Sequence, residues 1–226
     1  WNHTIIDANR ILGQIFFTLQ NKSQALQHYR IAQIRDGFPP KSTNGIENSI
    51  QLARVLTMER QIPEARRIID NVVAFTKEKG LQSYHIQALI VTAFCDLFED
   101  NFQESKEKFT SANNQAVKLG LKYEQVWSLK GLAELAVNQH QYNEAERLLL
   151  ETLEESEEHH LVWQHLNAWT HYIELMKTIN QSAVSDDIWL KFRSMLKEVD
   201  RHTQSEALRN DFELARKRWE KGVTIL

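Results

Sequence analysis

Four histidines crowd one stretch of the chain, and they are the first side chains whose chemistry has to be weighed: His159, His160, His165 and His171. Imidazoles are common zinc ligands, but zinc needs ligands that converge in a tetrahedral arrangement. His160, His165 and His171 are five and six residues apart, so a helix would place them on different faces. We therefore predict no zinc site and interpret these residues as surface or interface histidines.

An acidic run and a single cysteine suggest two other kinds of chemistry. The acidic run lies on the solvent side of a predicted helix and lacks the loop geometry of calcium ligation; it comprises Glu151, Glu154, Glu155, Glu157 and Glu158. Cys95 has no histidine close to it in the sequence, so we interpret it as a buried small apolar group. No HExxH, CxxC or GxSxG motif and no phosphate-binding glycine loop occurs. We predict no metal, no cofactor and no enzymatic activity.

The composition narrows the class of protein further. Of the 226 residues, 42% are apolar and 25% charged, which is typical of a globular protein, and 7 glycines and 3 prolines are few for a sheet protein. The net charge of −3 gives no general attraction to nucleic acid, and the apolar runs are too short to span a membrane. A lone cysteine favours a reducing, cytoplasmic location. The chain begins with Trp1, so we interpret it as part of a longer regulatory or scaffold protein.

A spacing of 40 residues organises the whole chain. Small residues recur at this spacing, at Ala25, Ala65, Ser105, Ala145 and Ser185. Each is followed four residues later by a bulky apolar residue: Tyr29, Ile69, Phe109, Leu149 and Trp189. The pairs Gly80-Leu81 and Gly120-Leu121 recur in the same way, and His160-Leu161 occupies the next copy. A fixed period of this size predicts an array of stacked repeats.

Each repeat has the pattern of a helical hairpin. Apolar residues fall three and four positions apart on both sides of a polar, cap-forming break. The small residues, including Gly13, allow the two helices of a hairpin to approach closely. We predict an all-α, right-handed solenoid forming a single domain over residues 1–226. Its hairpins span about 4–40, 44–80, 82–120, 122–160 and 161–200, and a capping helix with an apolar stripe spans about 203–222.

This pattern resembles the tetratricopeptide repeat (TPR) family. In the first repeat the Leu12-Gly13 pair, Phe16, Ala25 and Tyr29 match the small-and-large signature of that family. The third repeat departs from it, because Asp96 stands where an apolar residue is usual. The period exceeds the usual TPR length of about 34 residues. It is similar to the sensor arrays of signal-transduction ATPases and transcription regulators, and to kinesin light chains.

The resemblance implies that the first helix of each hairpin lines a concave groove. Carried over by position, the candidate partner-binding residues are Arg10, Gln14, Phe17, Arg54, Phe94, Phe98, Trp127, Lys130 and Glu134. Phe94 and Phe98 are four residues apart, share a helix face, and would form an aromatic patch with Trp127. The alternative is that these rings pack between helices.

Arg10, Arg54 and Lys130 could hold an acidic group or a C-terminal carboxylate. Some TPR proteins clamp such a group with lysines and asparagines. Here Gln14 and Gln51 replace the asparagines, and Val91 replaces a basic residue. We therefore do not expect a carboxylate clamp of that kind.

Three classes of function follow from these observations. The first is a non-catalytic interaction module that binds a peptide or a partner helix in the groove. The alternative is an effector-sensing domain of a signal-transduction ATPase or transcription regulator, which needs an enclosed pocket for a small ligand. An enzyme is the third class, and no catalytic constellation supports it.

Overall fold

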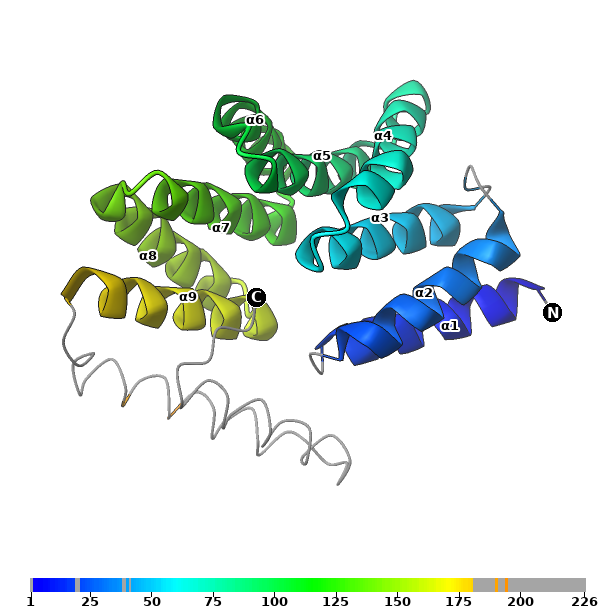
Figure 1. Ribbon diagram of the computed structural model, residues 1–226, viewed down its shortest axis with the longest axis horizontal. Helices are drawn as coiled ribbons and strands as arrows, with labels where there is room; N and C mark the ends of the chain where they lie inside the picture. The colour runs from blue at the N-terminus through cyan, green and yellow to red at the C-terminus, as the bar shows by residue number, and fades with distance from the viewer. Residues whose placement is uncertain are drawn as a thin grey trace. The chain divides into compact units, whose positions relative to one another are not determined.

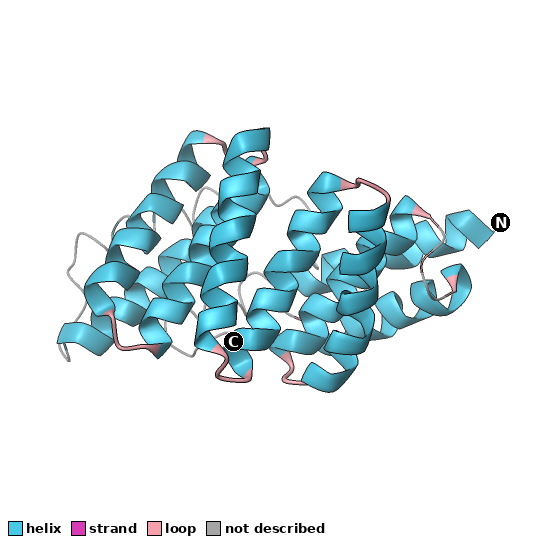
Figure 2. Cartoon of the chain, turned by 90° about the horizontal axis from the view of Figure 1, so that it is seen from above, coloured by secondary structure: helices cyan, strands magenta, loops and turns pink. Residues whose placement is uncertain are grey.

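Helices joined by short turns make up the computed structural model, which describes residues 2–18, 21–37, 40, 42–180, 190 and 194 (Figure 1). The elements in these residues are α1 (Asn2–Thr18), α2 (Lys22–Asp36), α3 (Thr43–Met58), α4 (Ile62–Glu78), α5 (Gln82–Phe98), α6 (Phe102–Leu119), α7 (Lys122–Asn138), α8 (Tyr142–Glu158) and α9 (Val162–Asn180). No strand occurs in this described part of the chain (Figure 2). The predicted all-α class is confirmed.

The helices pair as antiparallel hairpins and stack in the order of the chain. α1 packs on α2, α3 on α4, α5 on α6 and α7 on α8. Second helices then pack against the next first helix, as α2 does on α3, α4 on α5 and α8 on α9. First helices also contact one another, α1 with α3, α3 with α5, and α7 with α9. This is the packing of a TPR-like helical solenoid, which confirms the fold class.

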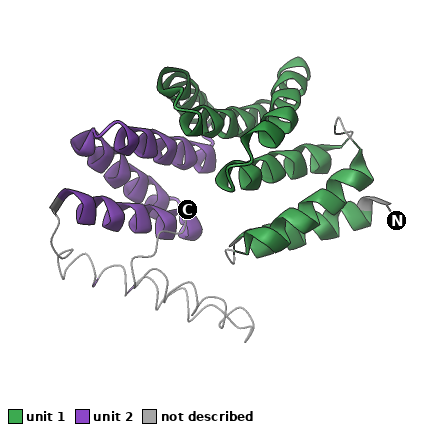
Figure 3. Cartoon of the chain, viewed as in Figure 1, with its two compact units in different colours: residues 1–119 green, residues 120–226 purple. Residues whose placement is uncertain are grey.

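Contacts divide the chain into two compact units, Trp1–Leu119 and Gly120–Leu226 (Figure 3). The first unit holds three hairpins, α1 to α6, and the second holds the α7–α8 hairpin followed by α9. A single continuous array over residues 1–226 remains a prediction. The second helix of the fifth hairpin, with Ser185, and the capping helix over 203–222 lie outside the described residues.

The small residues at the 40-residue spacing lie where helices approach closely. Ala25, Ala65, Ser105 and Ala145 are all fully buried. At Gly13, a Cβ atom would lie 2.6 Å from the ring of Tyr29, so even an alanine would not fit without movement of the tyrosine. The close approach predicted for Gly13 is therefore confirmed.

The helix ends repeat every 20 residues. A residue with left-handed backbone conformation follows each helix from α3 to α8: Arg60, Gly80, Asp100, Gly120, His140 and His160. His160 has a φ of 54°, close to the 65° and 66° of Gly80 and Gly120, as its position in the repeat predicts. A backbone hydrogen bond from the following residue closes the turns after α3, α4, α5, α7 and α8; one example is Leu161 N to Ser156 O at 2.9 Å.

Candidate functional site

The first helices of unit 1 are linked to one another by polar pairs. Arg10 on α1 donates to Glu47 on α3, with Nη1 3.0 Å from Oε1. Asn44 on α3 donates to the carboxylate of Asp7 on α1 at 2.5 Å. We call the side of α1 and α3 that carries Asp7, Arg10, Asn44 and Glu47 the unit 1 face. Arg10, a predicted partner-binding residue, thus lies on it in an ion pair between neighbouring hairpins.

Phe17 and Arg54 form a second link on the unit 1 face. The guanidinium carbon of Arg54 lies 4.7 Å above the ring centre of Phe17, and its Nη1 is 3.5 Å from the Gln51 side chain. Gln14, which is exposed, accepts a hydrogen bond from the hydroxyl of Tyr29 at 3.3 Å. Predicted residues from two successive hairpins therefore meet here through a cation–π stack.

The two predicted phenylalanines of α5 have different surroundings. Phe94 is 9% exposed and packs edge-on against Phe109 of α6, with ring centres 4.8 Å apart. Phe98 is half-buried, and the guanidinium carbon of Arg60 lies 3.5 Å from its ring centre. Phe94 is thus part of the hairpin core, and Phe98 carries a cationic group on its accessible side. Sequence reasoning missed Arg60, because it stands in the turn after α3 and outside the helical pattern.

Trp127 on α7 belongs to the second unit, where it is 4% exposed and lies beside Tyr123, with ring centres 5.9 Å apart. The predicted aromatic patch combines this ring with Phe94 and Phe98 of the first unit. That patch remains a prediction. Within its own unit, Trp127 packs among other side chains.

Lys130 and Glu134 of α7 meet two residues of α9 in a cluster of ionisable groups. Lys130 Nζ lies 3.0 Å from Glu134 Oε1. The imidazole of His171 stands between two carboxylates, with Nε2 3.5 Å from Glu134 Oε1 and Nδ1 3.7 Å from Glu174 Oε2. We call Lys130, Glu134, His171 and Glu174 the His171 cluster. His171 and Glu174 are three positions apart on α9, and this helical spacing is the signal that could have placed the histidine beside the carboxylate.

Burial shifts the pKa values of two members of this cluster, His171 and Glu174. It lowers the pKa of His171 to about 4; the positive charge of Lys130 acts in the same direction and Glu134 opposes it. Burial, together with the Glu134 carboxylate, raises the pKa of Glu174, against the influence of Lys177 and Lys130. The imidazole is therefore neutral at pH 7, although two carboxylates face it.

Asp96, the departure from the TPR pattern, is a buried junction between three helices. It pairs with Arg66 of α4 and with Lys108 of α6, whose Nζ is 2.5 Å away. Arg66 also donates to Glu99 at 2.6 Å. Burial lowers the pKa of the Arg66 guanidinium, but the hydrogen bonds to Asp96 and Glu99 outweigh it and raise the pKa overall. We call Arg66, Asp96, Glu99 and Lys108 the Asp96 cluster.

Two other histidines join hairpins. His85 Nδ1 lies 3.2 Å from Thr76 Oγ1 on α4, and His165 Nδ1 lies 2.9 Å from Ser156 Oγ on α8. These residues are 80 positions apart, two periods of the repeat. Burial lowers the pKa of both imidazoles. His165 is therefore an interface histidine, one of the two environments predicted for this group.

The surroundings of His159, His160 and Cys95 do not give them the character of a reactive site. His159 Nε2 lies 3.4 Å from Glu155 Oε2, and His160 is the residue with left-handed backbone conformation in the turn after α8. Burial raises the pKa of the Cys95 thiol to about 11, against the contact with Thr57, so the thiol is protonated at pH 7. Among the described residues, no three His, Cys, Asp or Glu side chains come together so that they could hold a metal ion. None of the helices in the described ranges is long and apolar enough to cross a membrane.

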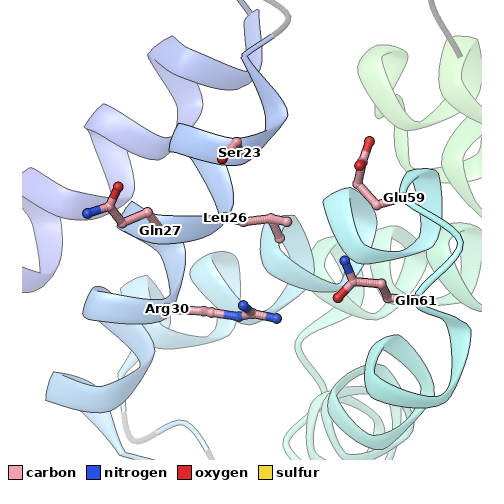
Figure 4. Close-up of a pocket in the computed structure, with 6 residues that line it drawn as sticks. All are labelled: Ser23, Leu26, Gln27, Arg30, Glu59 and Gln61. Atoms are coloured by element: carbon pink, nitrogen blue, oxygen red, sulfur yellow. The ribbon is translucent and has the colours of Figure 1, made fainter.

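A hollow of about 490 Å³ lies in unit 1 between α2 and the turn that joins α3 to α4 (Figure 4). Ion pairs flank it, since Arg30 Nη2 is 2.9 Å from Glu64 Oε2 and Lys22 Nζ is 3.1 Å from Glu59 Oε1. Five of its six lining residues are of polar type; the six are Ser23, Leu26, Gln27, Arg30, Glu59 and Gln61. Pockets for small effectors are enclosed and lined mostly by apolar side chains, whereas Leu26 is the one apolar residue among those that line this hollow.

Comparisons with known proteins identify the fold. No protein-family model matches the sequence, and no curated protein matches it. A similar solved structure is a Rap protein complexed with Competence and Sporulation Factor, with a TM-score of 0.71 and 14% identity. The match covers 92% of this chain and 55% of the Rap chain, so this chain spans about half the length of that protein.

A second similar structure is a putative kinesin light chain from Podospora anserina with nearly identical TPR-like repeats. Its TM-score is 0.55 and its identity 14%, and the match covers 87% of this chain and 96% of the other. Both neighbours have the TPR-like helical repeat fold, which agrees with the resemblance found in the sequence. At this level of identity they show the fold alone.

Proposed function

We propose that this chain is a non-catalytic protein–protein interaction module that binds a peptide or a partner helix along its first helices. The predicted residues on these helices are the contact residues: Arg10, Gln14, Phe17, Arg54, Phe98, Lys130 and Glu134, with Phe94 and Trp127 as the packed support beneath them. We further propose that the chain acts within a larger regulatory or scaffold protein in the cytoplasm.

The observation that carries this proposal is the pair of arginine–phenylalanine stacks in unit 1. Arg54 covers Phe17, and Arg60 covers Phe98. Each stack joins side chains from different hairpins, so the ring and the guanidinium are both held in place before a partner arrives. Aromatic rings and arginines are enriched among the residues that dominate binding energy, and preorganised contacts lose little entropy on binding.

The fold neighbours support the same kind of function. The solved Rap structure is a complex with Competence and Sporulation Factor. That partner belongs to the Rap protein, and only the capacity of a TPR-like solenoid to bind another molecule is carried over here. Repeat arrays of this type commonly provide extended binding surfaces.

Selection from a random peptide library displayed on phage would test the proposal. Peptides enriched on the immobilised chain would be synthesised and titrated by calorimetry against the wild type, Phe98→Ala and Arg54→Ala. We expect each substitution to weaken binding by about tenfold, which corresponds to about 1.4 kcal/mol. Arg147→Ala is the matched control, because Arg147 lies in exposed ion pairs on α8. Equal affinity of all four proteins, with native circular dichroism, would refute the proposal.

A further inference from the structure

The stack of Arg60 on Phe98 leaves the hydrogen-bonding edge of the guanidinium unused. Arg60 is exposed in the turn after α3, and its guanidinium carbon lies 3.5 Å from the ring centre of Phe98, the last residue of α5. At this distance the planar guanidinium lies flat on the ring, so its N–H groups point sideways, away from the ring. Among the described residues, no acceptor takes a hydrogen bond from these groups.

The acidic residues in the two turns that hold this stack do not neutralise Arg60. Glu59, the residue before it, forms an ion pair with the lysine at the start of α2, at 3.1 Å. Glu99, the residue after the phenylalanine, pairs with an arginine of α4 at 2.6 Å. Asp100 is exposed in the turn after α5 and forms no ion pair with Arg60. Within the described part of the chain, the guanidinium therefore carries its charge without a carboxylate in contact.

Arg60 differs in this respect from other arginines of unit 1. Arg10 and Arg30 each donate to a glutamate of the next hairpin. Arg54, the other stacked arginine, lies 3.5 Å from a glutamine side chain. Arg67 is exposed on α4 and contacts no aromatic ring in the described ranges. Arg60 thus combines an open hydrogen-bonding edge with a fixed orientation, and a side chain that is already held in place loses little entropy on binding.

The turn around Arg60 suits an acidic side chain better than the carboxylate at the end of a chain. Chain ends are captured by backbone N–H groups that converge on the carboxylate. Here the backbone N–H groups of Glu59, Arg60 and Gln61 all donate to carbonyl oxygens of α3, at 2.9 to 3.0 Å. The open edge of the guanidinium remains, and it matches both oxygens of an aspartate or glutamate side chain.

We infer that Arg60 is the anchor for an acidic side chain of the bound peptide. Phe98 holds the guanidinium in place, and the open edge of the guanidinium pairs with the carboxylate of an aspartate or glutamate in the partner. The inference rests on the function proposed above, and it gives the partner a definite chemistry. It also extends the contact surface from the first helices to the turn that joins α3 to α4.

Peptides selected from the random library are the probe for this inference, and we expect them to share an aspartate or glutamate. One such peptide, and its variant with that residue replaced by the amide, would be titrated against the wild type and Arg60→Gln. Each single change should weaken binding about tenfold. With the amide peptide, Arg60→Gln should change the affinity by less than about twofold, because the partner of the guanidinium is already absent. Arg67→Gln is the matched control, since it removes an exposed positive charge from the same unit, and it should bind as the wild type does.

Three outcomes would overturn the inference and leave the proposed function intact. The selected peptides could share no acidic residue, or Arg60→Gln could weaken the acidic peptide and its amide variant equally. The third is that amidation of the C-terminus of the peptide, and not loss of the side-chain carboxylate, removes the dependence on Arg60. A chain that enriches no peptide would overturn the proposed function and the inference together. Circular dichroism would check the fold of Arg60→Gln, and the change in the peptide tests the pairing with the chain unaltered.

Discussion

The two clusters of buried ionisable groups are balanced in different ways. In the Asp96 cluster of unit 1, the carboxylate of Asp96 lies between the cations Arg66 and Lys108. Arg66 forms a second ion pair, with Glu99. In the His171 cluster of unit 2, a neutral imidazole stands between Glu134 and Glu174. Two cations flank the central carboxylate of the first cluster, whereas in the second a neutral imidazole lies between two carboxylates, one of which pairs with Lys130.

The Asp96 cluster has a structural role, whereas a binding role for the His171 cluster remains a prediction. The Asp96 cluster joins α4, α5 and α6, and its central carboxylate is 5% exposed, so it holds two hairpins together. The His171 cluster contains Lys130 and Glu134, which were predicted as partner contacts. Its carboxylates are 18% and 27% exposed, and the pKa of Glu174 is raised.

The largest effect should follow from breaking the balanced cluster. Arg66→Met removes the cation that pairs with Asp96 and Glu99 and leaves the buried carboxylate with Lys108 alone. We expect the free energy of unfolding in urea to fall by about 3 kcal/mol at pH 7. Removing one partner of a buried pair is costly, because the other charge stays buried.

Arg147→Met provides the control for this measurement. Arg147 also pairs with two carboxylates, Glu144 and Glu151, but its side chain is 57% exposed. Solvent screens such pairs, so we expect a loss below about 0.5 kcal/mol. Equal losses for Arg66→Met and Arg147→Met would show that the Asp96 cluster does not join the hairpins.

The repeat could be predicted from the sequence because its determinants are local. Ala25 and Gly13 lie at close approaches, and Gly80, Gly120 and His160 end helices with left-handed backbone. These requirements recur at a fixed spacing whatever the neighbouring side chains are. The helical hairpins and the TPR-like packing follow from them.

The partners of individual side chains could not be predicted in the same way. Asp96 only looked like a departure from the pattern, since Arg66 and Lys108 lie 30 and 12 residues away on other helices. The helical spacing places Phe94 and Phe98 on the same face of α5 and does not distinguish them. In the structure, Phe109 buries Phe94, and Arg60 covers Phe98. Helical periodicity assigns a face, but packing between hairpins decides which residues of that face are accessible.

Acid should reduce stability through the neutral imidazoles. His171 titrates near pH 6.5 in the unfolded chain and near pH 4 in the folded chain. Between these values mainly the unfolded state takes up the proton, so His171 alone should lower the free energy of unfolding by about 2 kcal/mol from pH 7 to pH 5. His85 and His165 act in the same direction, while the raised pKa of Glu174 offsets part of the loss.

Urea unfolding at pH 7 and pH 5 would measure this dependence. His171→Gln should lose clearly less stability than the wild type over this range, with a residual slope from His85 and His165. His140→Gln, in an exposed turn, should behave as the wild type does. An identical pH dependence of His171→Gln and the wild type would contradict the neutral, buried state of this imidazole.

The smallest effect on stability should come from Glu134→Gln. This substitution removes one of the two carboxylates that face His171 and so tests how the His171 cluster differs from the Asp96 cluster. The ion pair with Lys130 is lost, but the repulsion between Glu134 and Glu174 is relieved, so the free energy of unfolding should change by less than about 1 kcal/mol. The pKa of Glu174, followed by carboxyl ¹³C NMR, should fall towards its ordinary value. The pKa of His171 should fall further, because Glu134 is the group that raises it. Glu151→Gln on α8 should leave both titrations unchanged, and an unshifted Glu174 in Glu134→Gln would mean that burial alone sets its pKa.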